Sequence, residues 1–142
     1  MSNFRIALTL LALVCCLSVF SKKKYPVLKC EQTVIDLGTF SQDDPVQKCT
    51  FKFRNVGNDK LIINYVHTSC GCTVADYPKN PISPGASGTI TVTYDGTGKM
   101  PGKFKKTIEV FSNTKEEVYR LVIQGVMSSM PKEVLKKSAT TK

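Results

Sequence analysis

The chain has 142 residues, of which 42 % are hydrophobic and 22 % are charged, so it is long enough for one globular domain and too short for two. Its 9 glycines and 7 prolines are too few for a collagen-like repeat, and its hydrophobic content excludes a wholly disordered chain. The formal net charge is +9, but residues 30–127 carry only +1 of it, which argues against a folded nucleic-acid-binding face.

The first predicted element is an apolar segment near the amino terminus. Residues Ile6–Ser21 carry no charge and consist mostly of Leu, Val, Ala, Ile and Phe. This length is typical of a signal peptide, because a spanning helix needs about 20 apolar residues. We predict that residues 1–21 form a signal helix that is cleaved, or an N-terminal anchor, since Lys22–Lys24 resist translocation. A lipoprotein modified at Cys16 is a third alternative. Cleavage or lipidation predicts an exported protein that is periplasmic or envelope-associated, whereas in the anchor alternative the lysines hold their flank of the segment inside.

Two basic segments flank the remaining chain. Residues 22–30 are predicted to be a basic linker, and residues 128–142 a flexible basic tail with four lysines and no strand alternation. Within the tail, Val134 and Leu135 leave open a weakly docked segment or a short helix. Such basic ends increase solubility and allow weak contact with a membrane surface. Because their cations are not gathered on a folded face, we expect no nucleic-acid partner.

Between these segments the pattern predicts short strands. Cys49, Phe51 and Phe53 alternate with polar residues, the period of two expected when one strand face packs and the other is wet. In the turns Asn55–Asn58 and Pro84-Gly85, a glycine or asparagine is expected to adopt a positive φ. Seven strands with regular turns indicate an all-β fold, a two-sheet antiparallel sandwich. The predicted strands lie near residues 33–40, 46–55, 60–68, 72–76, 87–95, 103–112 and 116–127.

Five motifs in this region resemble a known family in their order and spacing. They are Asp36-Leu37-Gly38, Phe51-Lys52-Phe53-Arg54-Asn55-Val56-Gly57-Asn58, Ser69-Cys70-Gly71-Cys72-Thr73, Ile82-Ser83-Pro84-Gly85 and Gly125-Val126. Over residues 31–127 the chain resembles the bacterial domain of unknown function 1573. The resemblance implies an immunoglobulin-like sandwich of the major sperm protein, Hydin and PapD type. It also implies an exported protein of the kind found in Bacteroidetes and related bacteria, and it implies no established activity.

Four cysteines remain in the predicted mature chain, and all are candidates for structural disulfides: Cys30, Cys49, Cys70 and Cys72. Cys49 shares the inward face of its strand with Phe51, and Cys30 lies just before the first predicted strand. A bridge between Cys30 and Cys49 would stabilise the fold by about 2 to 4 kcal/mol. The alternative is that both are small buried hydrophobic side chains.

The sharpest local feature is the motif Ser69-Cys70-Gly71-Cys72-Thr73. Alternate residues of a straight strand lie near the upper distance for a disulfide, so a bridge here needs the bend that glycine permits. A structural role is favoured. The alternatives are redox activity of the pair and a soft metal site for copper or zinc, built from His67, Cys70 and Cys72. A closed zinc site would need a fourth ligand from elsewhere in the fold.

The residue content gives catalysis little support. The single histidine, His67, has no orienting partner marked out by spacing. We therefore predict a non-enzyme with no catalytic residue, no cofactor and no resident metal. The predicted function is a noncatalytic immunoglobulin-like binding or scaffolding module of the bacterial cell envelope, with another exported or envelope protein as its partner. The competing hypothesis is a thiol-redox or soft-metal protein that uses Cys70 and Cys72 with His67.

Overall fold

The structure is a computed structural model that describes residues 23–139 of the chain. The predicted signal segment, residues 1–21, lies outside the described residues. No helix within residues 23–139 is long and apolar enough to cross a membrane. The described residues form eight strands and one helix, in chain order β1 (Leu28–Cys30), β2 (Val34–Ser41), β3 (Val46–Asn55), β4 (Ile63–Thr68), β5 (Thr73–Asp76), β6 (Ser87–Asp95), β7 (Gly102–Ser112), β8 (Val118–Ser128) and α2 (Lys132–Ala139).

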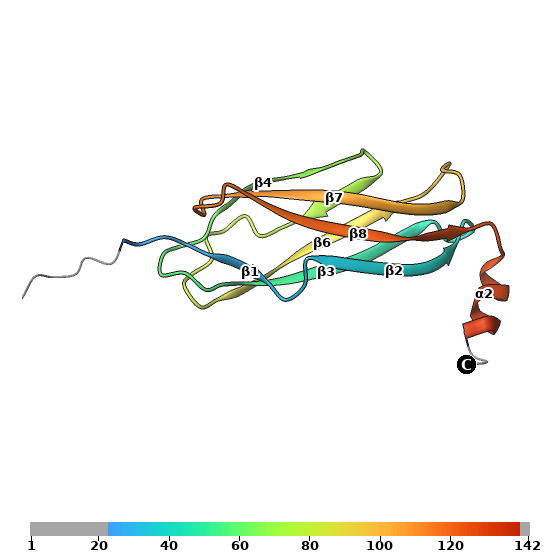
Figure 1. Cartoon of the computed structure of the whole chain (residues 1–142), viewed down its shortest axis with the longest axis horizontal. Helices are drawn as coiled ribbons and strands as arrows, with labels where there is room; N and C mark the ends of the chain where they lie inside the picture. Colours follow the sequence, from blue (N-terminus) through green and yellow to red (C-terminus); the bar gives the residue numbers. More distant parts are fainter. Residues whose placement is uncertain (1–22, 140–142) are drawn as a thin grey trace, which may run out of the picture.

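The strands form two four-stranded sheets packed as layers of a sandwich (Figure 1). One sheet has the order β1-β3-β6-β5, and the other has the order β2-β8-β7-β4. Neighbouring strands are antiparallel, except that β2 runs parallel to β8. The chain passes from the first sheet to the second between Cys30 and Val34. This arrangement confirms the predicted immunoglobulin-like sandwich.

The seven predicted strands correspond to β2–β8, and the additional strand is β1. It lies within residues 22–30, where a basic linker was expected, so that expectation does not hold for Leu28–Cys30. Three residues are too few to show an alternation that can be recognised in a sequence. Leu28 and Cys30 are buried, Lys29 is exposed, and the register places Cys30 opposite Phe53 of β3. The folded domain therefore begins before residue 31.

The alternation along each strand places one of its faces in a shared core. In β3, Phe51 and Phe53 are 0 % and 1 % exposed, whereas Lys52 between them lies in solvent. Across the ladder, Phe51 lies opposite Ile90, which is also fully buried. Burying side chains of this size contributes about 1.5 to 3 kcal/mol each. The other fully buried hydrophobic residues are Val92, Ile108, Val110, Leu121 and Ile123 from the two sheets, and Leu61, which lies just before β4.

The two predicted glycine turns use glycine for different reasons. Gly85 follows Pro84 and has a φ of 78°, which confirms the expected left-handed position. Gly57 has no positive φ, so the reason given for this turn was wrong. A Cβ at Gly57 would instead lie 2.5 Å from both the Tyr25 carbonyl oxygen and the Val27 nitrogen. Glycine is required there because the segment before β1 passes directly against the turn.

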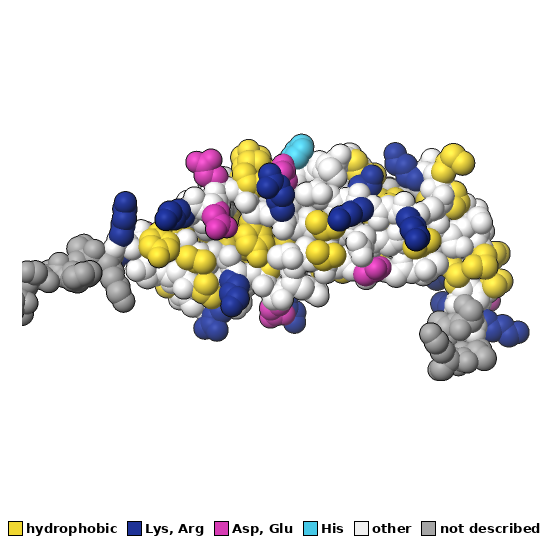
Figure 2. All heavy atoms as spheres, viewed as in Figure 1, with side chains coloured by type: hydrophobic (Ala, Val, Ile, Leu, Met, Phe, Trp, Pro, Cys, Tyr) yellow, Lys and Arg dark blue, Asp and Glu magenta, His cyan; other side chains and the backbone are white. Residues whose placement is uncertain are grey.

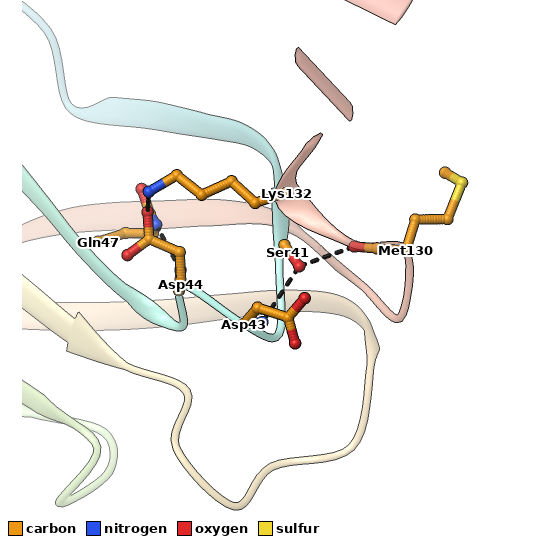
Figure 3. Close-up of polar contacts among 6 residues, drawn as sticks. All are labelled: Ser41, Asp43, Asp44, Gln47, Met130 and Lys132. Atoms are coloured by element: carbon orange, nitrogen blue, oxygen red, sulfur yellow. Dashed lines mark hydrogen bonds and ion pairs between the residues drawn. The ribbon is translucent and has the colours of Figure 1, made fainter. Parts of the chain in front are cut away.

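The segment after β8 differs from the flexible tail expected for residues 128–142, because it forms α2, the short-helix alternative (Figure 1). Figure 3 shows contacts from the start of this segment to the last residue of β2 and to the loop that follows β2. Lys132 forms an ion pair with Asp44, and the buried Ser41 Oγ donates a hydrogen bond of 2.7 Å to the Met130 carbonyl oxygen. These contacts hold the start of α2 beside the sandwich.

Candidate functional site

The predicted cysteine motif forms the loop between β4 and β5. This loop carries the chain from one sheet to the other. The Sγ atoms of Cys70 and Cys72 lie at bonding distance, and their Cα atoms are 5.2 Å apart, within the range that a disulfide spans. Thr68 Oγ1 lies within donating distance of the Cys70 and Thr73 carbonyl oxygens, at 3.2 Å and 2.8 Å. The motif is therefore a tight turn held by local hydrogen bonds.

The other residues of the motif anchor this turn. The Ser69 nitrogen donates to the Thr107 carbonyl oxygen at 3.0 Å, and Ser69 Oγ accepts from the Thr107 nitrogen at 3.2 Å. The Thr73 nitrogen donates to the Cys70 carbonyl oxygen at 3.2 Å, and the Thr73 side chain is buried. Gly71 is exposed, with open space where a Cβ would lie. These contacts favour the structural reading of the motif.

Replacing both Cys70 and Cys72 with serine is expected to lower the free energy of unfolding by about 1 to 2 kcal/mol. The effect is small because a bridge across three residues restricts the unfolded chain only slightly. Urea titration of the variant and the parent measures it. The variant should also complement a deletion strain of the native organism. Loss of complementation by a folded variant would contradict the structural role, since serine cannot replace a reactive thiolate.

The bridge proposed between Cys30 and Cys49 is absent, because both residues are free cysteines. Cys30 lies opposite Phe53 in the β1–β3 ladder, and Cys49 is four residues away from Phe53 along β3. At a rise of about 3.3 Å per residue, this offset is roughly 13 Å, well beyond the Cα separation that a disulfide allows. The alternative reading fits instead, since Cys30 is buried and Cys49 is half-buried against the core.

The Cys30 thiol should be unreactive in the folded protein. Burial raises its pKa from 9.0 to about 11, although a hydrogen bond with Tyr119 opposes part of that rise. At pH 8 its thiolate fraction is then about a hundredfold lower than that of a thiol with a pKa of 9.0. We expect slow alkylation by iodoacetamide in buffer and fast alkylation in urea, measured by mass spectrometry. Equal rates in the two solvents would contradict this environment.

The raised pKa of Cys30 also makes the free energy of unfolding depend on pH. The folded state holds the Cys30 proton more tightly than the unfolded state, so the stabilisation is complete below pH 9 and is lost as the pH rises towards 11. The urea midpoint should therefore fall across this window. A Cys30→Ala variant is the control, because it should lose this component of the pH dependence.

His67 does not join the two cysteines in a metal site. It is exposed on β4 and lies opposite Glu109 of β7. Within residues 23–139, no group of three His, Cys, Asp or Glu side chains is placed to hold a metal ion. The geometry therefore gives no support to the copper or zinc alternative built from His67, Cys70 and Cys72.

The open edges of the two sheets differ in how well they are protected. β1 has three residues, β5 ends at Asp76 close to Pro78, and the ladder of β2 shifts register between Asp36 and Thr39. Short strands, charges, prolines and bulges are the features that prevent an edge from adding another chain. By contrast, residues 61–75, which include β4 and the cysteine turn, contain no Lys, Arg, Asp or Glu. Of the four edge strands, β4 is the only one without a Lys, Arg, Asp or Glu, although its ladder also shifts register, between Ile63 and Tyr65.

An aromatic pair, the exposed Tyr65 and the half-buried Phe111, lies beside this edge. After a register shift at its start, β4 pairs regularly with β7 from Tyr65 to Thr68. Tyr65 is 51 % exposed, and its ring stacks on Phe111 of β7 with centroids 4.2 Å apart and planes 13° apart. Aromatic side chains are enriched at protein interfaces, where they bury a large area at a low entropic cost. The β4 edge therefore combines unpaired backbone with an aromatic surface.

Asn55 is the residue whose importance the sequence reasoning missed, since it was assigned only to a turn. It is fully buried at the end of β3. Its Oδ1 accepts hydrogen bonds from the Val27 and Gly57 nitrogens at 3.3 Å and 3.1 Å. Its Nδ2 donates to the Asp59 and Ile82 carbonyl oxygens at 2.7 Å and 3.0 Å. The sequence did contain a signal for this role. Asn55 occupies an inward-facing position in the alternation of β3, and a polar side chain that is buried there needs hydrogen-bond partners.

Comparison with known families supports the resemblance carried by the five motifs. A family model described as "Protein of unknown function (DUF1573)" matches residues 28–127, a range that begins with β1. No curated protein matches the chain.

Solved structures share the sandwich at low sequence identity. A protein of unknown function from Porphyromonas gingivalis W83 matches with a TM-score of 0.63 and 19 % identity, over 78 % of this chain and 50 % of that one. PapD-like domain 7 of human CEP192 matches with a TM-score of 0.61 and 8 % identity, over 81 % and 94 %. The VesB protease of Vibrio cholerae matches with a TM-score of 0.55 and 15 % identity, over 71 % and 31 %. At these identities the likeness shows the fold alone.

Proposed function

The chain belongs to the DUF1573 family of proteins of unknown function, and we propose that it is a noncatalytic binding or scaffolding module of the bacterial cell envelope. The observation that carries this proposal is the uncharged, unpaired edge of β4, beside the stacked rings of the exposed Tyr65 and the half-buried Phe111. The partner is another exported protein that contributes an extended segment to this edge.

Strand addition explains how such an edge binds. The backbone groups on the open side of β4 can form a ladder with an extended segment, which supplies affinity without requiring a pocket. Side chains of the added segment that point to the outer face would contact Tyr65, and this contact supplies selectivity. Residues 61–75 contain no Lys, Arg, Asp or Glu. A neutral or apolar segment can therefore bind along this edge without removing a charged side chain of residues 61–75 from water.

The titratable groups of the described residues support a noncatalytic role. Burial raises the pKa of both free thiols, Cys30 and Cys49, which disfavours the nucleophilic thiolate. His67 is exposed and lies opposite Glu109 in the ladder. A nucleophile and its base need to be held together within a sheltered site, and these groups do not provide one.

Export is part of the proposal. It is supported by the uncharged stretch Ile6–Ser21 and by the placement of Cys70 and Cys72 at bonding distance, since disulfides persist in oxidising compartments. The intact mass of the protein from its native envelope tests this. We expect a chain that lacks residues 1–21 or carries a lipid. A cytosolic chain that begins at Met1 would contradict export.

Site-specific crosslinking in the native bacterium tests the binding edge. A photoreactive p-benzoylphenylalanine is placed at Asn64 or His67, both exposed on β4, in the full chain. The control carries it at Thr39, which is exposed on the edge strand β2. We expect a defined adduct with one envelope protein from the β4 positions and little adduct from Thr39.

A matched pair of substitutions makes the test specific. In the crosslinking strain, Tyr65→Asp should abolish the adduct because it places a charge at the aromatic surface, whereas Thr39→Asp should leave it unchanged. The proposal would be overturned by the absence of adducts from both β4 positions, by equal adducts from Thr39, or by an adduct that survives Tyr65→Asp.

A further inference from the structure

The outer face of the other sheet carries a shallow groove of about 820 Å³. Three cations line it, Lys29 from β1 with Lys52 and Arg54 from β3. The register brings them together, because Lys29 lies directly opposite Arg54. On the next strand, Ser87 lies opposite Arg54, and Thr89 lies opposite Lys52. The groove therefore presents three positive charges beside two hydroxyl groups.

These charges are not neutralised by the protein. In the part of the chain that the structure describes, none of the three cations forms an ion pair with an acid. Glu31 is the one acidic side chain among the lining residues, which leaves a local excess of positive charge. Like charges placed opposite each other across a ladder destabilise a sheet. Figure 2 shows Lys and Arg side chains at several places along the visible face of the molecule.

The guanidinium of Arg54 is positioned before any ligand arrives. Its Nε donates a 2.8 Å hydrogen bond to the Gly85 carbonyl oxygen, in the turn that precedes β6. A guanidinium has five N–H donors, so this bond leaves the terminal N–H groups for a ligand. A planar fork of this kind matches the oxygen atoms of phosphate, and fixing it in advance lowers the entropic cost of binding.

We propose that this groove binds phosphate groups, with Lys29, Lys52 and Arg54 as the residues that hold them. Lysine and arginine supply charge, while Ser87 and Thr89 supply hydroxyl donors within reach of the same groove. Two sources present this chemistry in a cell envelope, the headgroup of an anionic phospholipid and a soluble phosphorylated molecule. The site lies on the sheet opposite β4, so it does not depend on the proposed partner edge.

The full chain can be tested against defined phosphate probes. One assay measures the binding of the full chain to phosphatidylcholine vesicles with and without phosphatidylglycerol. A second assay measures its binding to tripolyphosphate in solution. The double variant Lys29→Gln/Lys52→Gln removes two cations from the groove. The matched control Lys103→Gln/Lys105→Gln removes two exposed lysines from β7, on the other sheet. Thermal unfolding confirms that both variants are folded.

Removing the groove lysines should weaken binding by about fivefold per cation, or roughly 25-fold for the pair, with a much smaller loss in the control. Arg54→Lys keeps the charge but removes the fork, and it should weaken binding by several-fold. Binding to the phosphatidylglycerol vesicles alone assigns the site to lipid headgroups, whereas binding to tripolyphosphate assigns it to soluble phosphate. Either result supports the site.

Three results would overturn the proposal. One is that neither probe binds at low salt. The second is that the control double variant weakens binding as much as the groove variant does, which would mean that the overall charge is responsible. The third is that polyglutamate binds as tightly as tripolyphosphate, which would mean that the groove does not select phosphate.

Discussion

Replacing Asn55 with alanine is expected to lower the free energy of unfolding by about 4 kcal/mol, since four hydrogen bonds to buried or half-buried backbone groups would be lost at once. A buried backbone group that is left without a hydrogen-bond partner destabilises the folded state, because the hydrogen bonds that it made to water in the unfolded chain are not replaced. The side chain joins the segment before β1, the turn after β3 and the stretch before β6, so the loss loosens three parts of the fold together. Urea titration followed by circular dichroism measures the change.

Asn113→Ala is the matched control for this prediction. Asn113 also bonds backbone groups through its amide, to the Ile62 nitrogen and the Lys60 carbonyl oxygen, but it is exposed. Water can replace these partners, so we expect a loss of about 1 kcal/mol or less. Equal losses for the two variants would show that burial of Asn55 does not determine the effect.

Gly57→Ala is expected to destabilise the protein by about 3 kcal/mol through a clash with backbone. The new Cβ would lie 2.5 Å from the Tyr25 carbonyl oxygen and the Val27 nitrogen, and neither can move as a flexible side chain would. Relieving the clash displaces the segment before β1. That movement breaks the bonds from Val56 nitrogen to Val27 oxygen and from Asn58 nitrogen to Tyr25 oxygen, which measure 2.9 Å and 3.1 Å.

Gly71→Ala provides the corresponding control. Gly71 has no positive φ, and a Cβ there would meet no atom within 4 Å. Its effect should stay within about 0.5 kcal/mol. Thermal unfolding of the two alanine variants under the same conditions makes the comparison. If Gly57→Ala unfolded at the parent temperature, the close approach of the N-terminal segment would be contradicted.

The strands could be predicted from sequence wherever one face of the strand is buried and the other is exposed to solvent. In β3 the alternation of Phe51, Lys52 and Phe53 reports burial directly, so the strand and its inward face were both predicted correctly. β1 could not be found in this way, because it has three residues and owes its place to pairing with β3. Its position is a property of the assembled sheet rather than of a local pattern.

The candidate sites depended more strongly on contacts between distant residues. The cysteine turn could be recognised because Cys70, Gly71 and Cys72 are adjacent in sequence. The proposed bridge from Cys30 to Cys49 failed because it depended on the register between β1 and β3, which no local pattern specifies. The groove cations Lys29 and Arg54 come from two strands, so their convergence became visible only in the folded sheet.

Strand addition at β4 can be measured most directly by hydrogen exchange, on the free chain and on its complex with the crosslinked partner. Backbone amides from Tyr65 to Thr68 that do not bond to β7 face the open edge, so they should exchange rapidly in the free chain. In the complex, these amides should slow by about tenfold or more, because the added strand accepts their hydrogen bonds. Unchanged exchange in β4, with new protection at other edges or loops, would contradict the assignment of this edge as the binding site.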